Sequence, residues 1–243
     1  MNTSFRISLR FTAALALSTL LSTPLALAAS PIPTPNAAAR LTAVQTKGDA
    51  DINARLTSLN TLISKLGETK KLTTDQQTAL TTEMQGEVTS LTALKTKLDA
   101  DTDLATARAD FATIFSAHYI YAFYLPRVER IVAADAELDS VTTLGTLATT
   151  LQSYIDQAQT AGNDVTALQA KLNEMKSKTT DAETLAQTAL DSLRPLTASG
   201  YPANKTTIQT AGTTLKTGRI DLETARSDAK SLVASLKLLL KLQ

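Results

Sequence analysis

The chain has 243 residues, with 24 basic and 23 acidic side chains, one histidine and no cysteine. The lack of cysteine excludes disulfides, thiolate metal sites and cysteine nucleophiles. Basic and acidic residues are mixed along the sequence rather than gathered into a basic patch, so we expect no nucleic-acid partner. Phosphate loops, dinucleotide fingerprints and nucleophile elbows are absent from the sequence, and we therefore expect neither a cofactor nor an enzyme.

Residues 1–28 have the pattern of a signal peptide. Arg6 and Arg10 precede an apolar run over 11–21, and the Ala-Leu-Ala at 26–28 suits cleavage. The apolar run is shorter than the roughly 20 residues that a membrane-spanning helix needs. We expect an extracytoplasmic protein (secreted, periplasmic or at the cell surface) with no transmembrane span in the mature chain. An uncleaved N-terminal anchor is the alternative.

Residues 29–36 contain three prolines and predict an extended, exposed lead-in, with Asn36 placed to cap a first helix. This helix is expected to end at Gly67. In Thr74-Asp75-Gln76-Gln77 the spacing predicts a capping box, with Thr74 as the N-cap of a second helix.

Beyond Asn36, apolar residues recur at steps of three and four, which is typical of amphipathic helices. Each helix should bury the resulting seam. The expected seam residues are Ile52, Leu56, Leu59, Ile63 and Leu66 in the first helix; Leu80, Met84, Leu91, Leu94 and Leu98 in the second; Val165, Leu168, Leu172, Met175, Ala182, Ala189 and Leu193 in the helix after Gly162; and Ile208, Leu215, Leu222, Ala225, Ala229, Leu232 and Leu236 in the last.

The stretch from Phe111 to Ile131 holds most of the aromatic residues, the only histidine and a proline, Pro126. As a helix it would be apolar over so much of its circumference that neighbours must cover it on several sides. No turn-forming residue flanks Pro126, so we expect the proline to kink one helix that runs from Thr102 to the break at Gly162. A reversal of the chain at Pro126 is the alternative.

The sequence therefore predicts an all-α fold of long antiparallel helices. Matched helix lengths favour two three-helix bundles in tandem, over 37–125 and 126–243, that share the kinked helix. The alternative is one compact six-helix bundle.

Three blocks carry a resemblance. These blocks are Leu98-Asp99-Ala100-Asp101-Thr102-Asp103-Leu104-Ala105-Thr106, Tyr119-Ile120-Tyr121 with Pro126, and Tyr201-Pro202-Ala203-Asn204-Lys205. The chain resembles a group of uncharacterised, secreted, all-helical bacterial proteins over most of its mature length. The resemblance implies a secreted helical protein and brings no activity, so no functional residue is carried over from it.

Two features of the sequence contain residue types that occur in metal or catalytic sites. His118 has no second histidine and no nucleophile motif to serve, and we expect it to be a packed helix residue. Leu104 stands where a calcium loop requires glycine, so we expect capping and solvated acids rather than a metal site at the four carboxylates with calcium-loop spacing: Asp99, Asp101, Asp103 and Asp110.

We expect the aromatic side chains to form a core, with Phe115 inside it. Tyrosine keeps a polar end, so the candidates for contact with a partner are Tyr119, Tyr121 and Tyr124. Tyr124 is expected to point away from the apolar face and to be the best of the three.

The function we expect is that of a non-catalytic scaffold, spacer or partner-binding module, whose partner is another envelope or secreted protein or a wall polymer. One alternative is a small-ligand receptor or enzyme with a pocket at the stretch from Phe111 to Tyr124. Another is binding to a membrane surface through the C-terminal residues Leu236 to Leu242.

Overall fold

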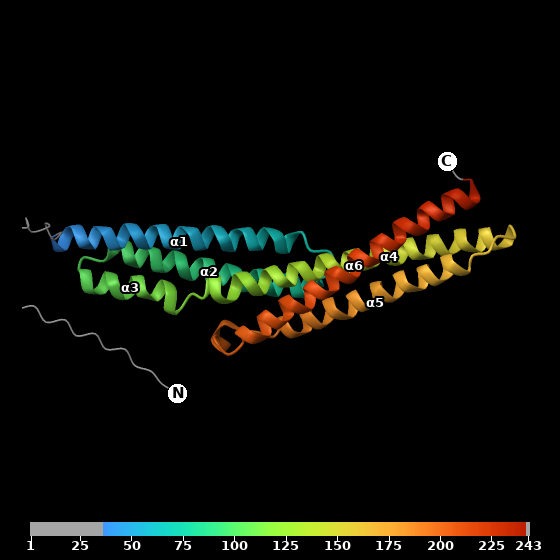
Figure 1. The fold of residues 1–243 in the computed structure, drawn as a ribbon. Coiled ribbons are helices and arrows are strands. Elements are labelled where there is room, and N and C mark those ends of the chain that lie inside the picture. The colour runs from blue at the N-terminus through green and yellow to red at the C-terminus, as the bar shows by residue number, and fades with distance from the viewer. Residues whose placement is uncertain (1–35, 242–243) are drawn as a thin grey trace, which may run out of the picture. The chain divides into compact units, whose positions relative to one another are not determined.

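The computed structural model describes residues 36–241, and all regular elements within them are helical. The all-α prediction is therefore confirmed. The expected signal peptide, and the lead-in apart from Asn36, lie outside the described residues. Between residues 36 and 241, none of the helices combines the length and apolar character that a membrane crossing requires. The elements are α1 (Ala37–Gly67), α2 (Thr74–Ala100), α3 (Leu104–Ser116), the π-helical segment η1 (Ile120–Tyr124), α4 (Leu125–Thr160), α5 (Thr166–Leu193), the short 3₁₀ segment η2 (Ala198–Gly200) and α6 (Lys205–Leu240) (Figure 1).

Side-chain caps start the first two helices. The Asn36 side chain accepts a hydrogen bond from the Ala39 amide at 2.8 Å, as predicted. The predicted capping box exists, but one residue earlier: Thr73 is the N-cap and exchanges hydrogen bonds with Gln76 at 3.0 and 3.3 Å. The sequence fits both registers of the capping box. The side-chain amide of Gln77 instead donates to the Leu66 carbonyl at the end of α1.

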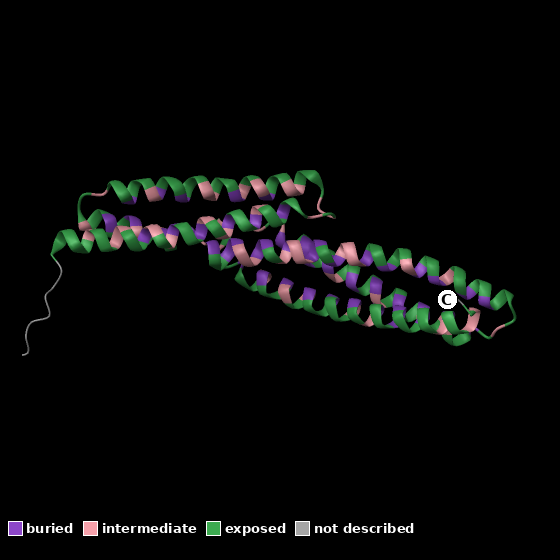
Figure 2. Ribbon diagram, turned by 90° about the horizontal axis from the view of Figure 1, so that it is seen from above, coloured by how far each residue is buried: buried purple, intermediate pink, exposed green. Residues whose placement is uncertain are grey.

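The apolar seams lie where periodicity placed them. The predicted residues of α2 are all buried, and so are those of α6. In α1 the phase is shifted slightly, because Leu62 is fully buried whereas Leu56 and Ile63 are only partly so. Figure 2 shows buried residues facing neighbouring helices and exposed residues facing outward.

Helices α1, α2 and α3 contact one another, and so do α4, α5 and α6, while α1 also contacts α4. The buried residues form two clusters. One lies among the second half of α4, α5 and α6. The other includes residues of α1, α2, α3, η1, the first half of α4, the end of α5 and the start of α6. Residues on both sides of the expected boundary after residue 125 share this second core, and the division into two bundles stays a prediction.

The break in the expected long helix lies before Pro126, not at it. Helix α3 ends at Ser116, residues 117–119 are not helical, and Pro126 stands in the first turn of α4. The preceding segment η1 has i→i+5 bonds, with the Leu125 amide donating to the Ile120 carbonyl. In an α-helix the proline ring would collide with the carbonyl four residues earlier, and the wider π turn moves this carbonyl away. The expectation of a kink located at Pro126 is therefore wrong.

Candidate functional site: the aromatic segment and its polar neighbours

The aromatic segment is divided between the surface and the core. Phe115 on α3 and Tyr121 on η1 are each 47% exposed, and the guanidinium of Arg55 on α1 lies near both rings. Its central carbon is 4.7 Å from the Phe115 ring centre and 5.1 Å from the Tyr121 ring centre. Phe111 packs edge-on against Phe115 at 5.4 Å. We call these four residues, Arg55, Phe111, Phe115 and Tyr121, the aromatic–arginine surface.

Arg55 gives this surface a fixed charge. Its side chain is only 8% exposed, and one of its terminal nitrogens donates to the Asp51 carbonyl at 2.9 Å. A guanidinium over aromatic faces is held by cation–π attraction, which strengthens as water is excluded. The two rings are thus half open to solvent on one side and fixed against a cation on the other.

Tyr124 lies in the core, which overturns the prediction that it points outward. It is 5% exposed, and its hydroxyl donates to one carboxylate oxygen of Glu87 at 3.0 Å. The expectation that Phe115 is a core residue is also wrong. The interruption at 117–119 and the π turn change the direction in which later side chains point, so the phase of α3 does not extend to Tyr124. Tyr119 is partly buried and packs on Tyr201, with 4.9 Å between ring centres.

His118 is packed, as predicted, although it lies outside a helix. It is 8% exposed, and its Nδ1 lies 2.9 Å from the second carboxylate oxygen of Glu87. Because that oxygen can only accept, Nδ1 carries the proton. Burial alone would raise the pKa of Glu87, but the hydrogen bonds from His118 and Tyr124 outweigh it and lower this pKa. Burial, together with the Glu87 charge, raises the pKa of Tyr124, so its hydroxyl stays a donor. His118, Glu87 and Tyr124 thus form one hydrogen-bonded network between the segment that follows α3 and helix α2.

A second buried polar group joins α2, α4 and α5. Arg127 is 2% exposed and donates to both carboxylate oxygens of Glu83, at 3.0 and 2.8 Å. It also donates to the carbonyls of Leu193 and Arg194 at the end of α5, both at 2.9 Å. A cavity of about 190 Å³ lies beside it, lined in part by Leu80.

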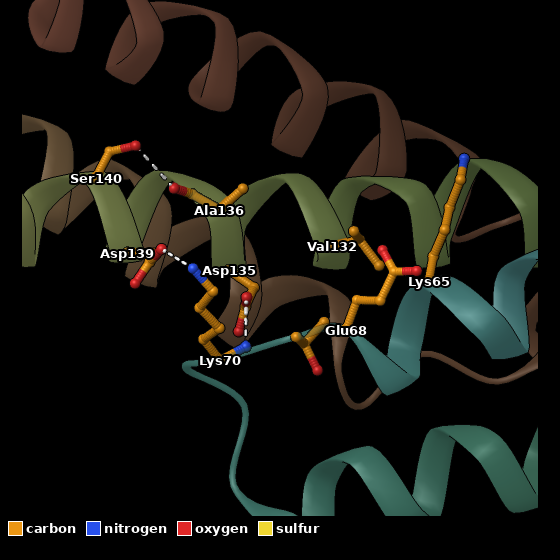
Figure 3. A pocket seen from close by; sticks show the side chains of 9 residues that line it. Lys65, Glu68, Lys70, Val132, Asp135, Ala136, Asp139 and Ser140 are labelled. Carbon is orange, nitrogen blue, oxygen red and sulfur yellow. Dashed lines mark hydrogen bonds and ion pairs between the residues drawn. The ribbon is translucent and has the colours of Figure 1, made fainter.

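The loop between α1 and α2 forms another cavity, of about 400 Å³, against α4 (Figure 3). Asp135 is buried and accepts backbone amide bonds from Lys70, Lys71 and Leu72 at 2.9, 2.5 and 2.8 Å. Asp139 pairs with the Lys70 ammonium at 2.8 Å, and this hydrogen bond lowers the pKa of Asp139. Through these three hydrogen bonds the Asp135 carboxylate holds the α1–α2 loop against α4.

Three of the four carboxylates with calcium-loop spacing have partners of their own. Asp103 is the N-cap of α3 and accepts from two backbone amides at 2.9 Å, so its predicted capping role is confirmed. Asp110 is buried and pairs with Lys97 at 2.8 Å, while Asp99 pairs with Lys95 at 2.8 Å. Within residues 36–241, no group of three or more histidine, aspartate or glutamate side chains is arranged to hold a metal ion.

Four polar residues of these groups are not predicted from the sequence: Arg55, Arg127, Glu83 and Glu87. A signal for Arg55 exists, since it stands three residues after Ile52 and four before Leu59 of the predicted seam. Comparison with models of known families, with curated proteins and with solved structures finds no match to this chain.

Proposed function

We propose that this chain is a non-catalytic helical protein of the cell envelope or exterior that binds a partner through the aromatic–arginine surface. The partner is another envelope or secreted protein, or a wall polymer. The extracytoplasmic location rests on the signal-peptide pattern of residues 1–28.

The observation that carries the proposal is the exposure of Phe115 and Tyr121 beside a buried Arg55. Burying large aromatic side chains is a strong source of stability, yet each of these two leaves 47% of its surface in water. Aromatic residues and arginine are also the side chains that most often dominate binding energy at protein interfaces. Because Arg55 fixes the rings, little conformational entropy is lost when a partner covers them.

The environment of Tyr124 and His118 favours surface binding over the small-ligand alternative. Tyr124 and His118 are occupied by Glu87, and the cavity beside Arg127 is about 190 Å³. Ligand pockets for small molecules are usually about 300–1,000 Å³.

Site-specific photocrosslinking tests the proposal. A benzophenone amino acid is placed at Tyr121 and, as a matched control, at Ile220, which is 54% exposed on α6. Proteins of an envelope extract and purified wall polymer are offered to both. We expect a discrete adduct from position 121 alone, which is lost when Phe115→Ala is added. Equal adducts from both positions would contradict the proposal, and so would a small-molecule thermal shift with no adduct.

A further inference from the structure

A cavity of about 380 Å³ between the start of α4 and the middle of α6 carries three cationic side chains. We call it the basic cavity. Gly212, Lys216 and Arg219 are separated by four and three residues, so they lie on one face of α6. The full lining consists of Glu129, Arg130 and Ala133 on α4, with Gly212, Leu215, Lys216 and Arg219 on α6.

The charges of the basic cavity do not cancel. Glu129 pairs with Lys65 of α1 at 3.8 Å, and Arg219 lies 3.9 Å from Glu137. Within residues 36–241, neither of the other two cations forms an ion pair. Three cations and one carboxylate leave the lining with an excess of two positive charges, and the two outside partners offset each other in this balance. An anion with two negative charges would neutralise this excess.

Arg130 is held at the cavity by an arrangement that lowers stability. Its Nη1 donates to the Pro126 carbonyl at 2.6 Å, and its Nε is buried with no acceptor in the described part of the chain. A Cβ at Gly212 would lie 2.6 Å from this Nε, so the guanidinium rests directly on the α6 backbone. Glycine inside a helix and a buried donor without an acceptor are both unfavourable. Local features that lower stability are expected at functional sites.

The chemistry of these cations fits a phosphate group. A guanidinium is planar and can donate to two phosphate oxygens at once, while a lysine ammonium adds a compact charge. A phosphate monoester carries about −1.5 to −2 charge at pH 7, which matches the excess in the basic cavity. The cavity volume of about 380 Å³ falls in the range of small-molecule sites, so there is also room for the organic group that bears the phosphate.

We propose that the basic cavity binds a small organic phosphate monoester. Its phosphate is bound by Arg130, Lys216 and Arg219. Its organic group lies against Leu215, where the Glu129 carboxylate accepts a hydrogen bond from a hydroxyl. This binding is independent of the proposed function of the aromatic–arginine surface, which shares no residue with the basic cavity.

Isothermal titration calorimetry of the full chain tests the proposal with three probes: glucose 6-phosphate, glycerol 3-phosphate and phenyl phosphate. The ionic strength is held at about 0.15 M, so that distant surface charges are screened. We expect at least one ester to bind with a Kd below about 1 mM. Glucose, glycerol and phenol should not bind. Inorganic phosphate and sulfate lack the organic group and should bind at least about tenfold more weakly than that ester.

A glycine substitution separates the position of Arg130 from the charge of the cavity. In Gly212→Ala the new methyl displaces the flexible end of Arg130 and leaves every charge in place, so binding should weaken at least about tenfold. Gly86→Ala, with open space around it, is the matched control and should bind as the parent does. Lys216→Gln should weaken binding by a similar factor, whereas Lys230→Gln, at an exposed position of α6 outside the cavity, should not.

Three results would overturn the proposal. The first is no binding of any of the three esters at about 1 mM. The second is parent-like binding by both Gly212→Ala and Lys216→Gln, with circular dichroism showing that the variants are folded. The third is an affinity for sulfate equal to that for the esters, which would mean an adventitious ion only.

Discussion

The carboxylate of Glu137 is a buried acid whose ionisation should weaken the fold. It lies on α4 with 7% of its side chain exposed and faces Gly218 of α6. Its oxygens have no hydrogen-bond partner among the described residues, and the nearest cation is Arg219, which is 62% exposed and 3.9 Å away. Burial raises the pKa of Glu137 from 4.5 to about 7, and the charge of Arg219 offsets this only in part.

The pKa of Glu137 is higher in the folded chain than in the unfolded chain, so folding depends on pH. Between pH 4.5 and about 7 the folded chain holds a proton on Glu137 that the unfolded chain has lost. Stability therefore falls as pH rises through this window. A shift of this size corresponds to about 3 kcal/mol once Glu137 is ionised, because one pKa unit equals about 1.4 kcal/mol.

Glu137→Gln removes the ionisation and keeps the shape of the side chain. Urea denaturation should show the variant close to the parent in stability at pH 5, and its advantage should grow by about 2 to 3 kcal/mol by pH 8. Glu129, on the exposed side of the same helix, supplies the control: Glu129→Gln should leave the pH dependence as in the parent. A difference between Glu137→Gln and the parent that is the same at both pH values would refute the reasoning.

Three further predictions concern packing. Gly48→Ala should lower the free energy of unfolding by about 1–3 kcal/mol, because its new methyl would meet the buried Leu98 side chain. Gly86 has open space around it, so Gly86→Ala should raise the free energy of unfolding by about 0.5–1 kcal/mol. Urea denaturation measures both, and a gain in stability at both positions would contradict this prediction. Tyr124→Ala should cost about 3–5 kcal/mol and Phe115→Ala no more than about 1 kcal/mol, and similar losses from both would mean that burial does not separate them. Small-angle scattering should give a radius of gyration well above about 17 Å if the helices form two bundles in tandem, and a value near it if they form one compact bundle.

Helix seams could be predicted from the sequence because they depend only on local periodicity. The apolar residues from Leu80 to Leu98 lie on one face of their helix, so this face is buried whichever helix packs against it. Exposure within the aromatic segment could not be predicted in the same way. The phase of α3 ends at Ser116, and each i→i+5 turn in η1 adds a residue to the turn, so the directions of Tyr121 and Tyr124 depend on a break that no local pattern marked.

Charged residues that fall in phase with an apolar seam can be predicted to point inward, but their partners depend on the tertiary structure. Arg55 follows Ile52 by three residues. In α4, Arg127 and Glu137 each stand four residues before a buried residue, Ile131 and Val141 respectively, so periodicity alone directs all three charged residues inward. The neighbours on other elements differ: Arg127 binds Glu83, Arg55 lies against two aromatic rings in addition to Asp51 of its own helix, and Glu137 has no strong partner. Since a buried charge is tolerated only with compensation, the partner decides its effect. A paired charge such as Arg127 fixes the helices, and a poorly paired one such as Glu137 makes stability depend on pH. Arg55 lies against two rings that remain half exposed. A partner that covers these rings would therefore be bound close to the Arg55 charge.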